Sequence, residues 1–277
     1  MIPSTRISFL FAAVLAVVPE SSFSLVTETP DPQHLHEAGL CRILNTVMRP
    51  TQRFPFWRNV GILNQSTGVY LGYGYVLTAA HVGPGVFSLQ DGSSYRPVAG
   101  SERRFRNSNG TFADLTLFRV SYRRDDLLAQ LPTIPMRRTC PGRGASVVLV
   151  GAGSGNSADD VMSSSVDFRW NDNTRMRWGL NRVEYQYQDP IETFAFRTPG
   201  FSTRFSKDNF ACQATPGDSG GAVFAFNPMF KRWELCGVIL AVDGSEGAAA
   251  YGNHTYIGDL SMLPAQIPNT PSFLASW

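Results

Sequence analysis

The sequence predicts an all-β protein made of two β lobes joined by a linker. The chain of 277 residues contains 25 Gly and 18 Pro, 12% of its residues are aromatic, and its apolar runs are short. Long runs of Glu, Lys and Leu, which would favour a helical bundle, are few. Short β-type runs bounded by Gly, Pro, Asn and Ser are typical of sandwiches and barrels.

The β-type runs form two series along the chain. The first series predicts a lobe over residues 53–127, with strands at 60–63, 67–71, 75–77, 86–89 and 115–120. The second predicts a lobe over residues 145–277, with strands at 145–150, 163–169, 176–180, 183–187, 222–226, 235–242 and 255–257. Residues 128–144, which are rich in Pro and Arg, are expected to link the two lobes.

The first 24 residues predict a secretory signal peptide. One charge, Arg6, precedes the apolar run 7–18, and small residues near Ser24 suit a cleavage site. The apolar run is too short to cross a bilayer. We therefore expect a secreted mature protein, periplasmic in a bacterial source, with no membrane anchor. Residues 25–52 are polar and contain three prolines, and we expect an arm or pro-segment rather than a core element.

Composition also bears on partners and disulfides. A formal net charge of +2, without blocks of basic residues, argues against a nucleic-acid partner. In an oxidising compartment, four cysteines predict two disulfides, for which three pairings exist. We favour Cys41 with Cys140, and Cys212 with Cys236. No metal site is expected, because the cysteines lack Cys-x-x-Cys spacing and His34-x-His36 lies in a Pro-rich stretch.

Three short motifs carry the chemistry. Residues 76–81 form an apolar strand that ends in small residues and His81. Residues 113–118 form an alternating strand opened by Asp114, whose carboxylate can fix the tautomer of a histidine beside it. Residues 216–223 read Pro-Gly-Asp-Ser-Gly-Gly-Ala-Val around Ser219. The glycines of this last motif allow consecutive N–H groups to converge on one point while the hydroxyl stands clear.

In this order, Thr-Ala-Ala-His, Asp-Leu-Thr-Leu and Gly-Asp-Ser-Gly-Gly resemble the motifs of the trypsin/chymotrypsin family of serine proteases over residues 60–260. The resemblance implies two antiparallel β-barrels with the active site in the cleft between them. It implies that Ser219 is the nucleophile, His81 the general base and then acid, and Asp114 the orienting group. The backbone N–H groups of Gly217 and Ser219 would form the oxyanion hole. The implied partner is a polypeptide substrate, and we expect a monomer that needs no cofactor.

The resemblance extends to candidate substrate-binding residues. Residues 235–242 resemble the strand that pairs with the substrate backbone, which implies contacts from Leu240, Ala241 and Val242. Gln213 lies six residues before Ser219, where trypsin-like enzymes place the aspartate that selects Arg or Lys. A neutral pocket and an uncharged P1 residue follow, although Asp243 and Glu246 lie on a nearby loop.

One further correspondence with the family concerns activation, and one departure concerns the network around Asp114. Asp218 corresponds to the residue that, in members activated by cleavage, pairs with a newly freed N-terminal amine. Arg42-Ile43-Leu44-Asn45 echoes the usual cut site, which makes Ile43 a candidate for this amine and the protein a candidate zymogen. Leu240 lies where the family often has a serine hydrogen-bonded to the catalytic aspartate, which predicts a looser network around Asp114.

Two other functions fit parts of the sequence. A noncatalytic binding or adhesion protein of the same fold would generally lack a triad residue, and none is lost here. The string Gly217-x-Ser219-x-Gly221, followed by Asp243 and His254, also fits an α/β-hydrolase esterase. That fold needs a helix after the serine, whereas residues 222–226 are β-type.

Overall fold

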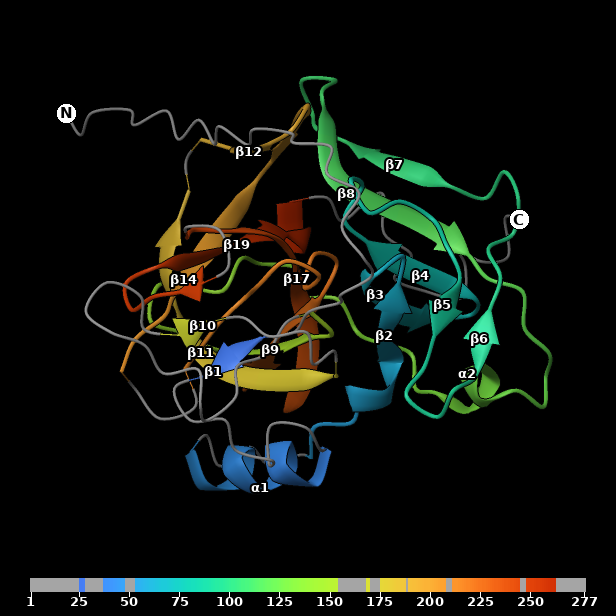
Figure 1. Cartoon of the computed structure of the whole chain (residues 1–277), viewed down its shortest axis with the longest axis horizontal. Helices are drawn as coiled ribbons and strands as arrows, with labels where there is room; N and C mark the ends of the chain where they lie inside the picture. The colour runs from blue at the N-terminus through green and yellow to red at the C-terminus, as the bar shows by residue number, and fades with distance from the viewer. Residues whose placement is uncertain are drawn as a thin grey trace.

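The computed structural model describes residues 25–27, 37–47, 53–153, 168–169, 175–187, 189–207, 211–244 and 248–262. Two β lobes lie side by side (Figure 1), which confirms the predicted all-β class. The predicted signal peptide of residues 1–24, together with His34, His36 and Glu246, lies outside the described residues. None of the helices described is long and apolar enough to cross a membrane.

The first lobe is a seven-stranded antiparallel sheet in the order β6-β5-β2-β3-β4-β8-β7. Its strands are β2 (Val60–Leu63), β3 (Ser66–Gly72), β4 (Tyr75–Thr78), β5 (Phe87–Ser88), β6 (Ser94–Tyr95), β7 (Arg103–Arg106) and β8 (Phe112–Arg119). The strands at one edge, β5 and β6, have only two residues each, which keeps this edge short. The longest strand, β8, pairs with β4 and carries one of the three chemical motifs.

The second lobe is a closed six-stranded barrel in the order β11-β14-β19-β17-β16-β9. Its strands are β9 (Ser146–Gly151), β11 (Arg177–Gln186), β14 (Gly200–Arg204), β16 (Ala222–Asn227), β17 (Arg232–Val242) and β19 (His254–Asp259). Three two-stranded pairs accompany the barrel: β1 (Val26–Thr27) with β15 (Cys212–Gln213), β10 (Phe168–Arg169) with β18 (Ala248–Ala249), and β12 (Ile191–Thr193) with β13 (Phe196–Thr198). The last pair is a short hairpin between β11 and β14.

Strand β9 explains how the two lobes share a core. Successive side chains of a strand point to opposite faces. Val147 and Leu149 pack inside the second lobe, whereas Val148 and Val150 pack in a cluster with Leu77 and other residues of the first lobe. A run buried on both faces is apolar throughout, as observed here. The junction between the lobes is therefore a packed apolar layer that fixes their relative position.

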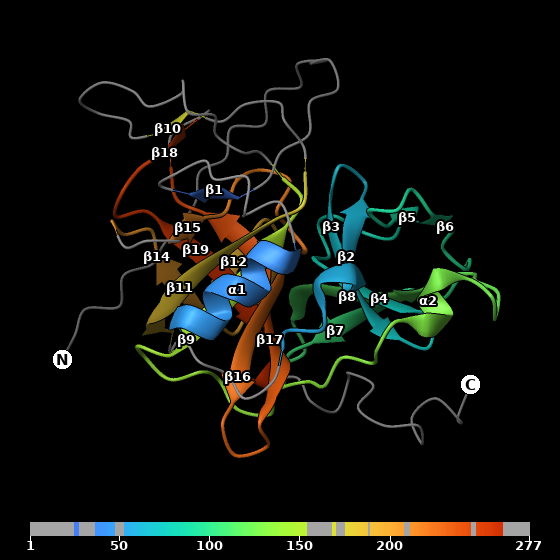
Figure 2. The same ribbon diagram turned by 90° about the horizontal axis from the view of Figure 1, so that it is seen from below.

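The N-terminal segment departs from the expected polar arm. Helix α1 (Glu37–Val47) lies on the outside of the second lobe (Figure 2). Its side chains Leu40 and Leu44, one helical turn apart, are 0% and 1% exposed and join the core cluster shared by the lobes. Phe54 continues this packing with its ring centroid 5.0 Å from that of Phe224. This part of the segment is thus a core element.

The predicted linker is bonded to both lobes. The short helix α2 (Leu127–Gln130) begins one residue before it. Two 3-10 turns, Trp57–Asn59 and Leu260–Met262, lie elsewhere in the chain. The N–H of Ile134 donates to the Leu71 carbonyl of the first lobe at 3.1 Å. Met136 forms a parallel bridge to Leu235 of the second. The connection is therefore held along its length.

The predicted disulfides are wrong for this structure, in which all four thiols are free. Cys41 lies on α1, where its sulfur accepts a hydrogen bond from Arg53 Nε at 3.3 Å and packs against the shared core. Cys140 packs against the core of the second lobe instead. The Cys236 thiol donates to the Val223 carbonyl at 3.2 Å, and burial raises the pKa of Cys212 and of Cys236. Protonated, buried thiols of this kind are unreactive.

Candidate active site

The pairing of β4 with β8 brings His81 to Asp114. Thr78 lies opposite Thr116 in this antiparallel pair, so the turn after β4 passes over the start of β8. His81 Nδ1 lies 2.7 Å from Asp114 Oδ2, and the His81 backbone N–H donates to Asp114 Oδ1 at 2.9 Å. The Asp114 side chain is 0% exposed and the imidazole 19%. The carboxylate therefore accepts from Nδ1–H, which leaves Nε2 free to accept a proton.

Asp114 has two further partners on the β12–β13 hairpin. Thr193 Oγ1 donates to Asp114 Oδ2 at 2.6 Å, and the Asp114 N–H donates to Thr198 Oγ1 at 2.8 Å. Leu240 in place of a serine predicted a looser network around Asp114. In the structure, the Thr193 hydroxyl donates the hydrogen bond that this serine would supply. Sequence reasoning missed both threonines, since neither belongs to a motif.

The Ser219 motif is docked onto the first lobe beside these residues. The Thr67 N–H donates to the Ser219 carbonyl at 2.9 Å, and Thr67 Oγ1 donates to the Gly217 carbonyl at 2.9 Å. Gly220 has a φ of 84°, and a Cβ there would collide with the Thr67 carbonyl and the Thr78 hydroxyl. Thr78 is the last residue of β4 and His81 follows in the turn, so the serine motif contacts the end of the strand that leads to the histidine.

Within the described residues, the Ser219 hydroxyl and the imidazole are not joined by a hydrogen bond. Ser219 is half-buried, and His81 keeps part of its ring exposed. Catalytic hydrogen bonds are often long without substrate and tighten when it binds. The arrangement thus places a hydroxyl, an imidazole and a buried carboxylate at one junction between the lobes.

Two backbone N–H groups of the serine motif have no acceptor among the described residues. The N–H groups of Asp218, Gly220 and Gly221 donate to the carbonyls of Thr215, Ile239 and Asp218, respectively. Those of Gly217 and Ser219 have no acceptor in the part of the chain that the structure describes. Gly217 has a φ of 92°, a conformation that glycine adopts without strain. A pair of free donors flanking Asp218 can bind the oxygen of a substrate carbonyl as it becomes negative.

Asp218 itself points away from this pair into the second lobe. Its carboxylate is fully buried and accepts hydrogen bonds from the N–H groups of Gly153 and Thr215, both at 2.9 Å, and from that of Leu25. Burial raises the pKa of Asp218 to about 8, although Thr215, Arg177 and Leu25 oppose the rise. Of the three N–H groups at this carboxylate, that of Leu25 comes from the N-terminal segment.

The predicted candidate for that position, Ile43, lies elsewhere. It is in the middle of α1 and packs against the core cluster shared by the lobes. Leu25 is 0% exposed, and the next two residues form β1, which pairs with β15. The idea of a cut after Arg42 that inserts Ile43 therefore has no support in this geometry.

The predicted substrate-binding strand has an open edge. On one side, 241–242 pair with β19. On the other side, β17 pairs with β16 only as far as Val238, and the Ile239 carbonyl accepts from Gly220 N–H. Among the described residues no strand lies beyond this point on that side. The backbone of 240–242 can therefore pair with an extended peptide, although the Leu240 side chain is itself buried.

Gln213 lies on β15 and is 0% exposed. Its Nε2 donates to the Asp243 carbonyl at 2.9 Å, and its Oε1 accepts from Ala250 N–H at 3.3 Å. The side chain is thus held by backbone groups, and its contact with a substrate stays a prediction.

Asp243 and His254, the other two residues of the alternative hydrolase triad, form a hydrogen bond with each other. His254 Nδ1 lies 2.9 Å from Asp243 Oδ2, and Tyr256 OH donates to Asp243 Oδ1 at 2.8 Å. Although burial opposes it, these hydrogen bonds hold the pKa of Asp243 below its usual value. Ser219 is followed by strand β16 and not by a helix, which contradicts the nucleophile elbow.

In the described part of the chain, no cluster of three or more His, Cys, Asp or Glu could hold a metal ion.

A closed barrel beside a second antiparallel sheet, with a histidine–aspartate pair at their junction, is the architecture of chymotrypsin-like proteases. The sequence pattern of the family Trypsin matches residues 43–261, and the chain belongs to this family of peptidases. Curated proteins include no match to the sequence.

Two solved structures are similar to this chain. The first is the inactive form of a serine-to-alanine mutant of Rv3671c from M. tuberculosis H37Rv, with 13% identity, a TM-score of 0.48, and coverage of 87% of this chain and 97% of that one. The second is the NS6 protease from murine norovirus 1, with 14% identity, a TM-score of 0.43, and coverage of 76% of this chain and 93% of that one.

Proposed function

We propose that the protein is a secreted, monomeric serine endopeptidase that hydrolyses polypeptides through an acyl-enzyme on Ser219. The observation that carries the proposal is the 2.7 Å contact between His81 Nδ1 and the buried Asp114 carboxylate. A histidine held in this way presents Nε2 as a base, and the serine motif is docked beside the strand that leads to it.

In the proposed reaction, side chains and backbone groups of this chain act on the peptide substrate and on one water molecule. His81 Nε2 takes the Ser219 hydroxyl proton as Oγ attacks the carbonyl carbon of the scissile bond. The carbonyl oxygen becomes negative and binds the free N–H groups of Gly217 and Ser219. The imidazolium, stabilised by Asp114, then donates its proton to the leaving amine. His81 then deprotonates a water molecule, which attacks the acyl-enzyme; the C–Oγ bond breaks, the carboxylic acid product leaves, and His81 returns the proton to Ser219 Oγ.

The proposed substrate binding uses the open edge of β17. An extended peptide would add its backbone to 240–242 and so bring its carbonyl to Ser219. The test is digestion of a peptide library by the purified mature protein, with Ser219→Ala as the control. We expect cleavage at internal bonds by the wild type and none by the variant. Equal cleavage by both would contradict the proposal.

The proposed maturation follows from the predicted cleavage near Ser24. Removal of residues 1–24 would make Leu25 the first residue and convert its N–H, which already bonds to Asp218, into an ammonium group. An ammonium beside a buried carboxylate stabilises its charged form. Secretion would thereby supply the counter-charge for Asp218 without a further cut.

A further inference from the structure

The β12–β13 hairpin contacts both residues of the histidine–aspartate pair. Thr193 Oγ1 is 2.6 Å from Asp114 Oδ2, and Thr193 is buried. The next residue, Phe194, is 78% exposed, and its ring centroid lies 5.3 Å from that of His81, with the rings inclined at 44°. Two adjacent residues of one hairpin thus contact the pair: the buried Thr193 contacts the Asp114 carboxylate, and the exposed Phe194 contacts the His81 imidazole.

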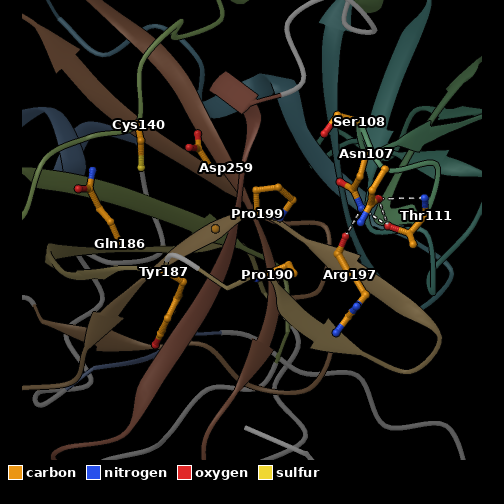
Figure 3. A pocket seen from close by; sticks show the side chains of 12 residues that line it. Asn107, Ser108, Thr111, Cys140, Gln186, Tyr187, Pro190, Arg197, Pro199 and Asp259 are labelled. Atoms are coloured by element: carbon orange, nitrogen blue, oxygen red, sulfur yellow. Dashed lines mark hydrogen bonds between the residues drawn. The ribbon is translucent and has the colours of Figure 1, made fainter. Parts of the chain in front are cut away.

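The hairpin is fixed on both sides. Ile191 lies opposite Thr198, and Thr193 opposite Phe196, in its antiparallel ladder. The Thr198 hydroxyl accepts the Asp114 N–H, and Asn107 Nδ2 of the first lobe donates to the Arg197 carbonyl at 2.6 Å. Figure 3 shows this last bond beside a cavity of about 380 Å³ that both lobes line. These hydrogen bonds from the first lobe therefore fix the position of the hairpin relative to the Asp114 carboxylate.

The backbone at Phe194 is strained. Its φ of 50° lies in the left-handed region, which costs a residue with a side chain about 1 kcal/mol or more. Glycine or asparagine would fit this turn more easily. A large apolar side chain that is exposed and strained next to a catalytic imidazole gains nothing from burial in the free protein. Its contact area becomes useful only when a substrate covers it.

Thr193 completes the partners of Asp114. Oδ1 accepts the His81 backbone N–H, and Oδ2 accepts both His81 Nδ1–H and the Thr193 hydroxyl. A buried carboxylate that loses a donor has an unsatisfied lone pair and fewer restraints on its rotation. Because Asp114 orients the imidazole, this looseness would reach Nε2 and the proton transfer.

We propose that the β12–β13 hairpin is a positioning and specificity element, in which Thr193 fixes the Asp114 carboxylate and Phe194 forms an apolar wall over His81 for an apolar side chain of the substrate. This inference rests on the proposed endopeptidase function. It assigns two further residues to that site from a segment that carries no motif.

The test of Thr193 removes its hydroxyl at constant volume. Thr193→Val is expected to lower kcat about tenfold or more with KM unchanged, because a hydrogen bond to a charged group is lost. Thr193→Ser restores a hydroxyl and should recover most of kcat. The matched control is Thr203→Val, since the buried Thr203 hydroxyl has no partner in the described part of the chain. It should leave kcat unchanged.

A spectroscopic readout separates positioning from a general loss of structure. The His81 Nδ1 proton, bonded to a carboxylate at 2.7 Å, should give a far-downfield proton resonance in the wild type, Thr193→Ser and Thr203→Val. The resonance should shift or broaden in Thr193→Val, with the other resonances retained. An unchanged kcat and an unchanged resonance in Thr193→Val would overturn the role of Thr193.

The test of Phe194 uses selectivity. The wild type should prefer an apolar residue over Gly at one position of a peptide library, and Phe194→Ala should reduce that preference about tenfold through KM. Its control is Phe230→Ala, an aromatic residue 60% exposed in the β16–β17 turn. An unchanged preference in Phe194→Ala would overturn its role. Failure of the wild type to cleave any peptide would instead contradict the proposed function itself.

Discussion

The backbone N–H of Leu25 donates a hydrogen bond to the buried carboxylate of Asp218, the residue before the candidate nucleophile. The two residues are distant in sequence and meet because β1 pairs with β15. The serine motif is therefore in contact with the residue that the predicted signal-peptide cleavage would make the N-terminus.

The first prediction concerns the N-terminus of the secreted protein. We expect mass spectrometry of the exported protein to give Leu25 as its first residue. A recombinant chain with two extra residues before Leu25 should be at least tenfold less active, because its Leu25 nitrogen is an uncharged amide. A secreted, active protein that begins at Ile43 would contradict this prediction.

The second prediction concerns the pH dependence of stability before cleavage. Burial raises the pKa of Asp218 from 3.8 to about 8. Below about pH 4 the carboxyl group is protonated in both the folded and the unfolded chain. Between about pH 4 and 8 only the unfolded chain ionises it, so the free energy of unfolding should fall as pH rises. Denaturant unfolding at several pH values measures this slope.

Asp218→Asn is the control for that slope. The variant lacks the titrating group, so its free energy of unfolding should depend less steeply on pH over the same range. Release of the Leu25 amine should likewise flatten the dependence, since the ammonium stabilises the ionised carboxylate. Equal slopes for the uncleaved wild type and Asp218→Asn would show that Asp218 ionises normally.

The third prediction concerns helix α1. Leu44 is 1% exposed in the core cluster, so Leu44→Ala should lower the free energy of unfolding by about 2–5 kcal/mol. Met229, 82% exposed in the β16–β17 turn, provides the comparison, and Met229→Ala should change it by less than about 0.5 kcal/mol. Thermal unfolding monitored by circular dichroism distinguishes the two. A Leu44→Ala variant as stable as the wild type would mean that α1 is a dispensable arm.

A fourth prediction concerns the cysteines. Since all four thiols are free, alkylation of the denatured protein without reductant should add four alkyl groups by mass. Prior reduction should not increase this number. Addition of only two groups without reductant, rising to four after reduction, would show that a disulfide forms in the protein.

The two lobes and the chemical motifs were predictable because their signals are local. Residues 76–81, 113–118 and 216–223 each combine a strand with a distinctive side chain, and pairing of neighbouring strands then brings His81 to Asp114. The apolar run of β9 was predicted as a strand, but its burial between the two lobes was not predicted. Local patterns of this kind need no knowledge of distant contacts.

The partners of the motifs were not predictable in the same way. Thr193 and Asp114 are 79 residues apart, and a threonine that donates to an aspartate leaves no pattern in the sequence. The β12–β13 strands have only three residues each, too few to show alternation. Helix α1 did carry a signal, because Leu40, Ile43, Leu44 and Val47 follow helical spacing. The prolines on either side of it led to the expectation of an arm.

The most direct test of Ser219 as the nucleophile is labelling with a fluorophosphonate, which reacts with a serine only when a base and an oxyanion site activate it. We predict one label per molecule, on the peptide that contains Ser219, with no label in Ser219→Ala and strongly reduced labelling in His81→Ala. Labelling that is absent in the folded wild type, or that persists in Ser219→Ala, would contradict the assignment of Ser219 as nucleophile.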